Sequence, residues 1–179
     1  MKKSVFPLSA GFLIAVLAKL FAFSAAVSAA AAVTPDADGF KSMSSQGFIF
    51  KWRVSGDKID CVVRSSTKGW LAVGFNGSKA MNGANIIIGY VDKDGIVKIE
   101  DDVAKGHSHK ADKVQNVENK FGSEQHGVTE LRFTIPLNSG DEEDFVLIPG
   151  QTYYVILALG AKDAFTGIHA KKTGIVITL

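Results

Sequence analysis

Cysteine is almost absent from this sequence. The 179 residues contain one cysteine, Cys61, so no disulfide can form within a single chain. A haem attached covalently through a Cys-x-x-Cys-His motif is excluded for the same reason. Because Cys61 alternates with Ile59 and Val63 in a strand-like run, we expect it to be a small buried hydrophobic side chain; an intermolecular disulfide is the alternative.

Motifs of hydrolytic and nucleophilic enzymes are also missing. The sequence has no Gly-x-Ser-x-Gly motif, no phosphate-binding loop and no Cys-His pairing. Its paired acids, Glu142 and Glu143, fall in a polar segment typical of a solvated loop rather than of acid-base chemistry. We therefore expect that the chain is not an enzyme by itself.

The first 29 residues have the pattern of a secretory signal peptide. Lys2 and Lys3 precede an apolar run, and the small residues of segment 24–32 follow it. A membrane helix needs roughly 20 consecutive apolar residues, and Lys19 interrupts this run. We expect cleavage near residue 29, a periplasmic or secreted protein and no stable membrane anchor; an uncleaved anchor is the alternative.

The charge balance gives no indication of a nucleic-acid partner. The full sequence carries 20 Lys and Arg against 18 Asp and Glu. Removal of residues 1–29 takes away three lysines and no acid, so 17 basic residues remain against 18 acidic ones. The remaining chain of about 150 residues is close to neutral and has room for one ordinary domain.

Helical periodicity is nearly absent, and short strand patterns take its place. We assign residues 30–46 to a linker and residues 47–179 to one domain, in which β-branched and aromatic runs end at glycine, asparagine or aspartate. Residues 48–54 alternate as a half-buried strand does, and residues 69–75 are typical of a central strand. Further strands are expected at residues 58–64, 84–92, 96–100, 126–135, 153–159 and 174–179 and near Val114, with a turn at Asp94-Gly95 and a polar loop over residues 101–112.

This count of nine or ten short strands favours an all-β fold. Turns separate the strands at short intervals, and no helical repeat interrupts them, as in an antiparallel β-sandwich. An up-and-down barrel is the alternative, because the number of strands does not decide whether a sheet closes.

Five short motifs, taken in order, resemble the DOMON domain family. The resemblance covers nearly all of the chain after residue 29 and implies an immunoglobulin-like β-sandwich that binds haem b or, in some branches, a sugar. The motifs are Gly69-Trp70-Leu71-Ala72-Val73-Gly74-Phe75, the run from Met81 to Val91, the acidic turn into Ile99-Glu100-Asp101, the run Phe133-Thr134-Ile135-Pro136-Leu137, and His169 with Gly174.

The haem-binding branch of this family includes the cytochrome domain of cellobiose dehydrogenase, and it holds iron between a methionine and a histidine. Carried over position by position, the resemblance implies Met81 and His169 as ligands of a non-covalent haem b. Two positions depart from the family pattern. Asn85 stands where an aspartate is usual, and residues 106–110 replace a loop that often contains proline.

The chemistry of these residue types points the same way. A thioether and an imidazole on haem iron leave no open site, and methionine raises the reduction potential, so the centre suits one-electron transfer to a redox partner protein or oxidoreductase subunit. We expect loops at one end of the sandwich to bring Met81 and His169 together, with Trp70 and Tyr90 as apolar walls. The alternative is a haem-free module in which Trp70 or Tyr90 stacks on a sugar or small aromatic ligand.

A separate metal site is a further alternative. His107 and His109 form a His-x-His pair, which in a strand places both rings on one face and suits copper or zinc. At least one more ligand is needed, and His126 or Asp112 is the nearest choice.

Overall fold

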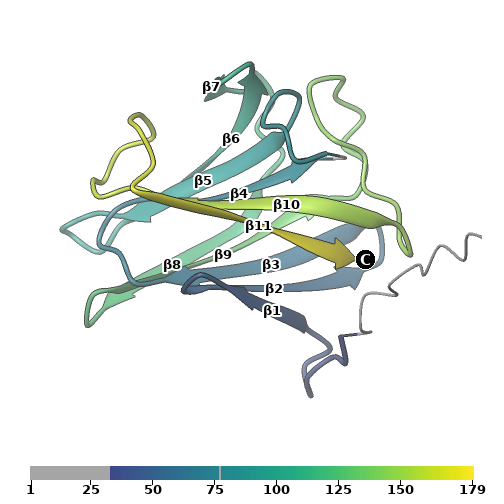
Figure 1. Cartoon of the computed structure of the whole chain (residues 1–179), viewed down its shortest axis with the longest axis horizontal. Helices are drawn as coiled ribbons and strands as arrows, with labels where there is room; N and C mark the ends of the chain where they lie inside the picture. Colours follow the sequence, from purple (N-terminus) through teal and green to yellow (C-terminus); the bar gives the residue numbers. More distant parts are fainter. Residues whose placement is uncertain (1–32, 77) are drawn as a thin grey trace, which may run out of the picture. The chain divides into compact units, whose positions relative to one another are not determined.

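The protein folds as two stacked antiparallel sheets, and the computed structural model describes residues 33–76 and 78–179 (Figure 1). One sheet has five strands in the order β1-β2-β3-β9-β8, and the other has six in the order β11-β10-β4-β5-β6-β7. The predicted antiparallel β-sandwich is confirmed. The strands are β1 (Lys41–Ser45), β2 (Phe48–Ser55), β3 (Lys58–Ser65), β4 (Leu71–Asn76), β5 (Asn85–Val91), β6 (Val97–Lys105), β7 (Ser108–Ala111), β8 (Glu118–Gln125), β9 (Val128–Pro136), β10 (Thr152–Leu159) and β11 (Lys171–Thr178).

The predicted signal peptide, residues 1–29, lies outside the described residues. Within the two described ranges, no helix has the length and apolar character that a membrane crossing requires. All the regular elements in these ranges are strands, as the lack of helical periodicity predicted.

The five-stranded sheet begins earlier than the sequence pattern indicates. β1 lies inside residues 30–46, the predicted linker, and pairs along its whole length with β2. Its sequence Lys-Ser-Met-Ser-Ser has one apolar side chain, so its alternating burial leaves no hydrophobic pattern to detect. Gln46 and Gly47 form the two-residue turn, with φ of 48° and 85°. Gln-Gly is a weaker sequence signal for such a turn than Asn-Gly is.

The polar loop predicted over residues 101–112 is instead a hairpin. β6 continues to Lys105, Gly106 turns the chain with a φ of 66°, and β7 returns along it. The prediction was wrong because Asp101 and Asp102, which read as loop residues, are buried strand residues at 0% and 2% exposure. The strand expected near Val114 begins at Glu118.

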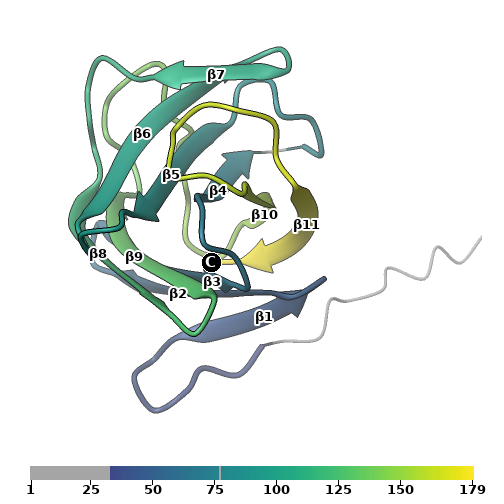
Figure 2. The same ribbon diagram turned by 90° about the vertical axis from the view of Figure 1, so that its left-hand side faces the viewer.

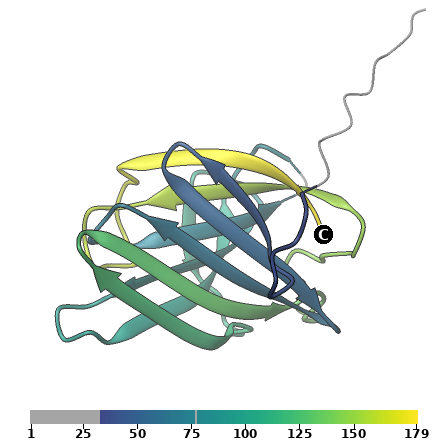
Figure 3. The same cartoon turned by 90° about the horizontal axis from the view of Figure 1, so that it is seen from below.

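The main core lies between the two sheets and confirms the alternation read from the sequence. Phe48, Phe50 and Trp52 of β2 all point into it, and the rings of Phe50 and Trp52 stack with centroids 5.7 Å apart. Cys61 is 1% exposed in the same core, so it is a buried hydrophobic side chain as predicted, and burial raises the pKa of its thiol well above the usual value. Figure 3, a view from below, shows the five-stranded sheet in front.

Strands β4 and β5 are buried on both faces, although the sandwich has two layers. Every residue of both strands is buried. Val73 and Ile87 face the main core, whereas Ala72 and Ile86 belong to a second apolar cluster on the outer face of the six-stranded sheet. In Figure 2 the yellow connection between β10 and β11 arches across this outer face. The outer face therefore carries a covered apolar surface that is a candidate ligand site.

Candidate functional site

A cavity of about 680 Å³ lies on the outer face of the six-stranded sheet. This volume falls within the range of roughly 300–1,000 Å³ that is usual for ligand sites. The floor of the cavity is apolar and low at its centre, where the side chains are no larger than a methyl group at Ala72, Gly74 and Ala158. The site thus lies on a sheet face that two connections cover. The sequence analysis instead expected it among loops at one end of the sandwich. The strand residues that line it are Ala72 and Gly74 of β4, with Trp70 just before that strand, Ile86 and Ile88 of β5, His109 of β7, Tyr154, Ile156 and Ala158 of β10, and Lys172, Thr173 and Gly174 of β11.

Met81 enters the cavity from the connection between β4 and β5. The side-chain amide of Asn76 donates hydrogen bonds to the carbonyl oxygens of Ala80 at 2.6 Å and Asn82 at 3.2 Å. On the other side of the methionine, the Asn82 Oδ1 accepts a hydrogen bond from the Gly106 N–H at 2.7 Å. The methionine is half-buried against the outer cluster, between residues that fix the path of its backbone.

His169 enters the same cavity from the connection between β10 and β11. Backbone hydrogen bonds fasten both ends of this connection: the Gly160 N–H donates to the Trp70 carbonyl at 2.9 Å, and the Ala170 N–H donates to the Leu159 carbonyl at 2.7 Å. His169 itself is exposed at the rim. Two residues 88 positions apart in sequence are therefore brought to one cavity by two connections that start from neighbouring strands.

Of the two predicted aromatic walls, Trp70 lines the cavity, whereas Tyr90 does not. Tyr90 instead packs against Phe165 of the β10–β11 connection, with ring centroids 5.0 Å apart. The exposures of Trp70 and Tyr90 are 5% and 8%, which leaves little open ring face for a sugar to stack on. The sequence analysis expected Tyr90 as an apolar wall of the site, whereas in the structure it packs against the connection that carries His169.

His107 and His109 also line the cavity, from the β6–β7 hairpin. The Nδ1 of His109 lies 2.5 Å from the Oδ2 of the buried Asp102, and this hydrogen bond raises the pKa of the imidazole. Next to Asp102 on β6, burial and the Asp102 charge raise the pKa of Glu100 to about 7. His107 and His109 therefore form an imidazole wall of the cavity, and the buried Asp102 lies behind His109. The sequence analysis placed these three residues in a polar loop and did not foresee this wall.

The proposed third ligands of a His-x-His metal site are not brought to these histidines. His126 lies in the turn between β8 and β9 of the other sheet, and Asp112 is not among the residues lining the cavity. Over the described residues, no group of three or more His, Cys, Asp or Glu side chains is arranged to hold a metal ion.

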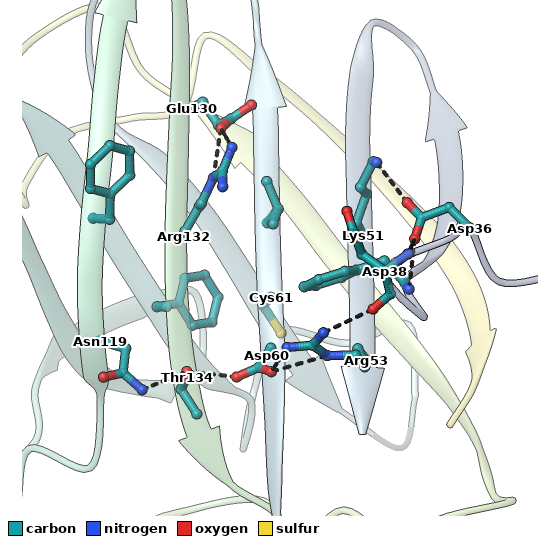
Figure 4. A pocket seen from close by; sticks show the side chains of 14 residues that line it. Asp36, Asp38, Lys51, Arg53, Asp60, Cys61, Asn119, Glu130, Arg132 and Thr134 are labelled. Atoms are coloured by element: carbon teal, nitrogen blue, oxygen red, sulfur yellow. Dashed lines mark hydrogen bonds and ion pairs between the residues drawn. The ribbon is translucent and has the colours of Figure 1, made fainter. Parts of the chain in front are cut away.

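A second hollow of about 540 Å³ lies on the five-stranded sheet, and its charged groups largely pair with one another (Figure 4). Arg53 reaches Asp60 at 2.7 Å, and Lys51 reaches Asp36 at 3.1 Å. The Lys51–Asp36 contact fastens the segment before β1 to the sheet, and the Arg53–Asp60 contact joins β2 to β3. The two contacts hold the pKa of Asp36 and of Asp60 below the usual value. The hollow contains neither Met81 nor His169, and the pairing of its charged side chains has a structural role.

The outer cavity therefore combines an apolar floor, a thioether and an imidazole, with Lys79 and Lys172 also in its lining. Together these features define a class of protein, a small β-sandwich with a cavity of ligand size on the outer face of one sheet. Residues 44–160 match the DOMON domain family, and the chain belongs to this family. Met81 lies inside the matched range, and His169 lies nine residues beyond its end.

Two solved structures share the fold. The cytochrome b domain of pyranose dehydrogenase from Coprinopsis cinerea is similar with a TM-score of 0.62 at 12% identity, over 77% of this chain and 80% of that one. The cytochrome domain of cellobiose dehydrogenase from Myriococcum thermophilum is similar with a TM-score of 0.63 at 13% identity, over 83% of this chain and 88% of that one. No curated protein matches the sequence.

Proposed function

We propose that this protein binds one non-covalent haem b in the outer cavity, with Met81 and His169 as the iron ligands, and that it passes single electrons to or from a redox partner. One observation carries the proposal: a methionine and a histidine from two separate connections line the same apolar cavity. The two structural relatives support it, since both are cytochrome domains by name.

The residues of the cavity fit a flat cofactor with an apolar ring and anionic side groups. The low floor at Ala72 and Gly74 leaves room above the sheet, and the isoleucines beside it exclude water. Lys79 and Lys172 in the lining suit the carboxylates of the propionates. Held by Met81 and His169, the group would supply one-electron redox chemistry rather than the binding of oxygen or peroxide.

The partner follows from the same chemistry. An electron carrier without a catalytic group of its own needs a protein that donates or accepts electrons, such as a dehydrogenase subunit, as the names of the structural relatives suggest. We also propose that the chain acts in the periplasm or outside the cell, after cleavage near residue 29. The mass of the N-terminal peptide from exported protein tests this step directly.

The visible absorption spectrum of the protein, oxidised and then reduced with dithionite, tests the ligation. We expect sharp low-spin bands from the protein and altered bands from Met81→Ala and His169→Ala. Met43→Ala and His126→Asn are matched controls, because Met43 packs against the main core and His126 lies in a turn of the other sheet. Asparagine suits position 126 because it tolerates the φ of 53° found there.

His107 and His109 need their own variants because both line the cavity. We expect His107→Ala and His109→Ala to keep the low-spin bands. If His109→Ala removes them while His169→Ala does not, the assignment of His169 is wrong. A protein that stays colourless after reconstitution with haem contradicts the whole proposal and turns attention to a haem-free ligand.

A further inference from the structure

A cluster of acidic and amide side chains is buried on the inner side of the six-stranded sheet, across the sheet from the cavity. Asp101 in β6, Asp112 after β7 and Asn85 at the start of β5 have exposures of 0%, 7% and 4%. Asp144, from the connection between β9 and β10, closes the cluster. Its Oδ1 accepts a hydrogen bond from the Asn85 amide at 2.8 Å, and its Oδ2 accepts one from the Asn116 amide at 2.8 Å.

Four oxygens of this cluster are buried and have no hydrogen-bond partner among the described residues. They are both carboxylate oxygens of Asp101, the Oδ2 of Asp112 and the Oδ1 of Asn85. A buried carboxylate oxygen without a partner is destabilising, and here Asp101 has two such oxygens and Asp112 has one, with the Asp144 carboxylate nearby. Burial and the neighbouring Asp144 charge raise the pKa of Asp101 to about 8, although the backbone N–H of Asn116 acts in the opposite direction, so the surroundings tolerate its negative charge poorly.

The backbone around the cluster is closely held, so these oxygens cannot simply turn to water. Gln115 accepts a hydrogen bond from the Asp101 N–H at 2.9 Å and donates one to the Asp101 carbonyl at 2.8 Å. The Asp112 N–H donates to the same carbonyl at 2.8 Å. The Val114 N–H donates a hydrogen bond to the Oδ1 of Asp112 at 3.2 Å. The Oδ2 of Asp112 is therefore left on the buried side without a partner.

We propose that this cluster is a binding site for one calcium ion, with the orphaned oxygens of Asp101, Asp112 and Asn85 among its ligands. All the donors are hard oxygens, and calcium accepts six to eight carboxylate, amide and carbonyl oxygens in a flexible arrangement. Magnesium requires a stricter octahedral arrangement and usually keeps several water ligands. A closed site has no place for these waters. Both oxygens of Asp144 already accept hydrogen bonds from Asn85 and Asn116, so the proposed donors are two carboxylates and one amide oxygen. Such a set is not a group of three acids, and none arranged to hold a metal is found over the described residues.

The ion would tie together segments that are distant in sequence. It would join the start of β5, which follows Met81 by four residues, to the middle of β6 and to the segment after β7, and through the Asn85–Asp144 hydrogen bond to the β9–β10 connection. Asp102 lies next to Asp101 and faces His109 in the cavity wall. Calcium would therefore stabilise the edge of the cavity without being part of the iron site.

Calorimetric titration of the purified protein with CaCl₂, together with its melting temperature in EDTA and in CaCl₂, tests the proposal. We expect one ion per chain and a rise in Tm of roughly 5–10 °C at a calcium concentration 100 times the Kd. Magnesium should give a clearly smaller rise. The titration gives its answer with haem-free and haem-loaded protein alike, so it succeeds or fails independently of the iron ligation.

Asp101→Asn is the decisive variant, and Asp94→Asn is its control. Asp101→Asn removes the charge at equal volume, so we expect it to melt in EDTA at or above the temperature of the unchanged protein and to lose the calcium response. Asp94 is exposed in the hairpin turn before Gly95, where Asn-Gly is equally suitable, so the response should persist. Absence of calcium binding by the unchanged protein, or a full response from Asp101→Asn, overturns the proposal, and an equal response to magnesium overturns the choice of calcium.

Discussion

Phe165 packs its ring against that of Tyr90 with a centroid distance of 5.0 Å, and this contact holds the β10–β11 connection on the outer face of the sheet. Tyr90 is 8% exposed, and the Lys98 Nζ lies 5.7 Å from the centroid of its ring. Phe165 is four residues before His169. The position of the proposed ligand therefore depends on an aromatic pair that does not itself line the cavity.

Phe165→Ala should loosen the connection that carries His169. We expect a loss of unfolding free energy of about 1–3 kcal/mol, since the ring is half-buried and its aromatic pair contributes roughly 0.5–1.5 kcal/mol beyond area burial. Haem should dissociate faster, while any bound haem keeps the low-spin bands. Chemical denaturation and haem transfer to apomyoglobin measure the two effects. Phe121→Ala, 55% exposed on the other sheet, is the control, and equal effects from both variants contradict this role.

The low floor of the cavity predicts a graded response at Gly74. A Cβ at this position meets Ile156 and Ile86 at 3.5 Å, an ordinary contact, so Gly74→Ala should fold and still bind haem. Gly74→Leu should fill the space above the sheet and reduce haem binding at least tenfold, with a cost in stability of about 1–3 kcal/mol from overpacking. Haem titration followed by absorbance separates them. Unchanged binding by Gly74→Leu contradicts the assignment of this cavity to haem.

Stability should fall as the pH rises from about 5 to 8 when cations are removed. The pKa of Asp101 is raised to about 8 and that of Glu100 to about 7, so the folded state holds protons that the unfolded state releases near pH 4. His109, whose pKa is also raised, acts in the same direction because its ion pair with Asp102 is lost as the pH rises. Urea denaturation in EDTA should show a loss of about 2–4 kcal/mol, discounted for screening by water at the partly exposed members.

The acids of the other sheet act at lower pH. Arg53 holds the pKa of Asp60 below its usual value, so the contribution of this pair is present above about pH 4 and lost as the pH falls further. Maximal stability in EDTA is thus expected in mildly acidic solution. Asp101→Asn should flatten the decline between pH 5 and 8, whereas Asp94→Asn should leave it. Stability that rises from pH 5 to 8 in EDTA contradicts the raised pKa values.

The sequence predicted those parts of the fold in which apolar side chains alternate with polar ones. β2, β3, β9 and β10 were found close to their expected bounds because their inward residues are large and apolar. β1 and β7 were missed because their residues are small or polar, and pairing with a neighbouring strand is what makes them strands. Such pairing depends on tertiary context, which periodicity along one segment does not contain.

The candidate site, like the fold, could be predicted only in part from the sequence. Met81 and His169 could be proposed from their order among the motifs, and the structure places both in one cavity. That the cavity lies on a sheet face could not be foreseen, because an uninterrupted apolar strand such as β5 is compatible with burial in any surroundings. The acidic cluster was hidden for the opposite reason: Asp101 and Asp102 are typical of loops, and a buried strand carries them here.

Asn85→Asp tests the difference between this chain and the pattern usual for the family. Asn85 donates a hydrogen bond to Asp144 at 2.8 Å, and an aspartate would replace this donor by a second negative charge. In EDTA at pH 8 we expect a loss of unfolding free energy of about 1–3 kcal/mol, because a buried carboxylate would face another without a proton between them.

With calcium, Asn85→Asp should instead be more stable than the unchanged protein. The added charge strengthens the site, so the Kd for calcium should fall about tenfold and Tm should exceed that of the unchanged protein at the same calcium concentration. Calorimetry and melting curves measured in EDTA and in calcium decide the matter. If Asn85→Asp destabilises the protein equally in both solutions, the Oδ1 of Asn85 does not face a cation, and the cluster is held together by protons instead.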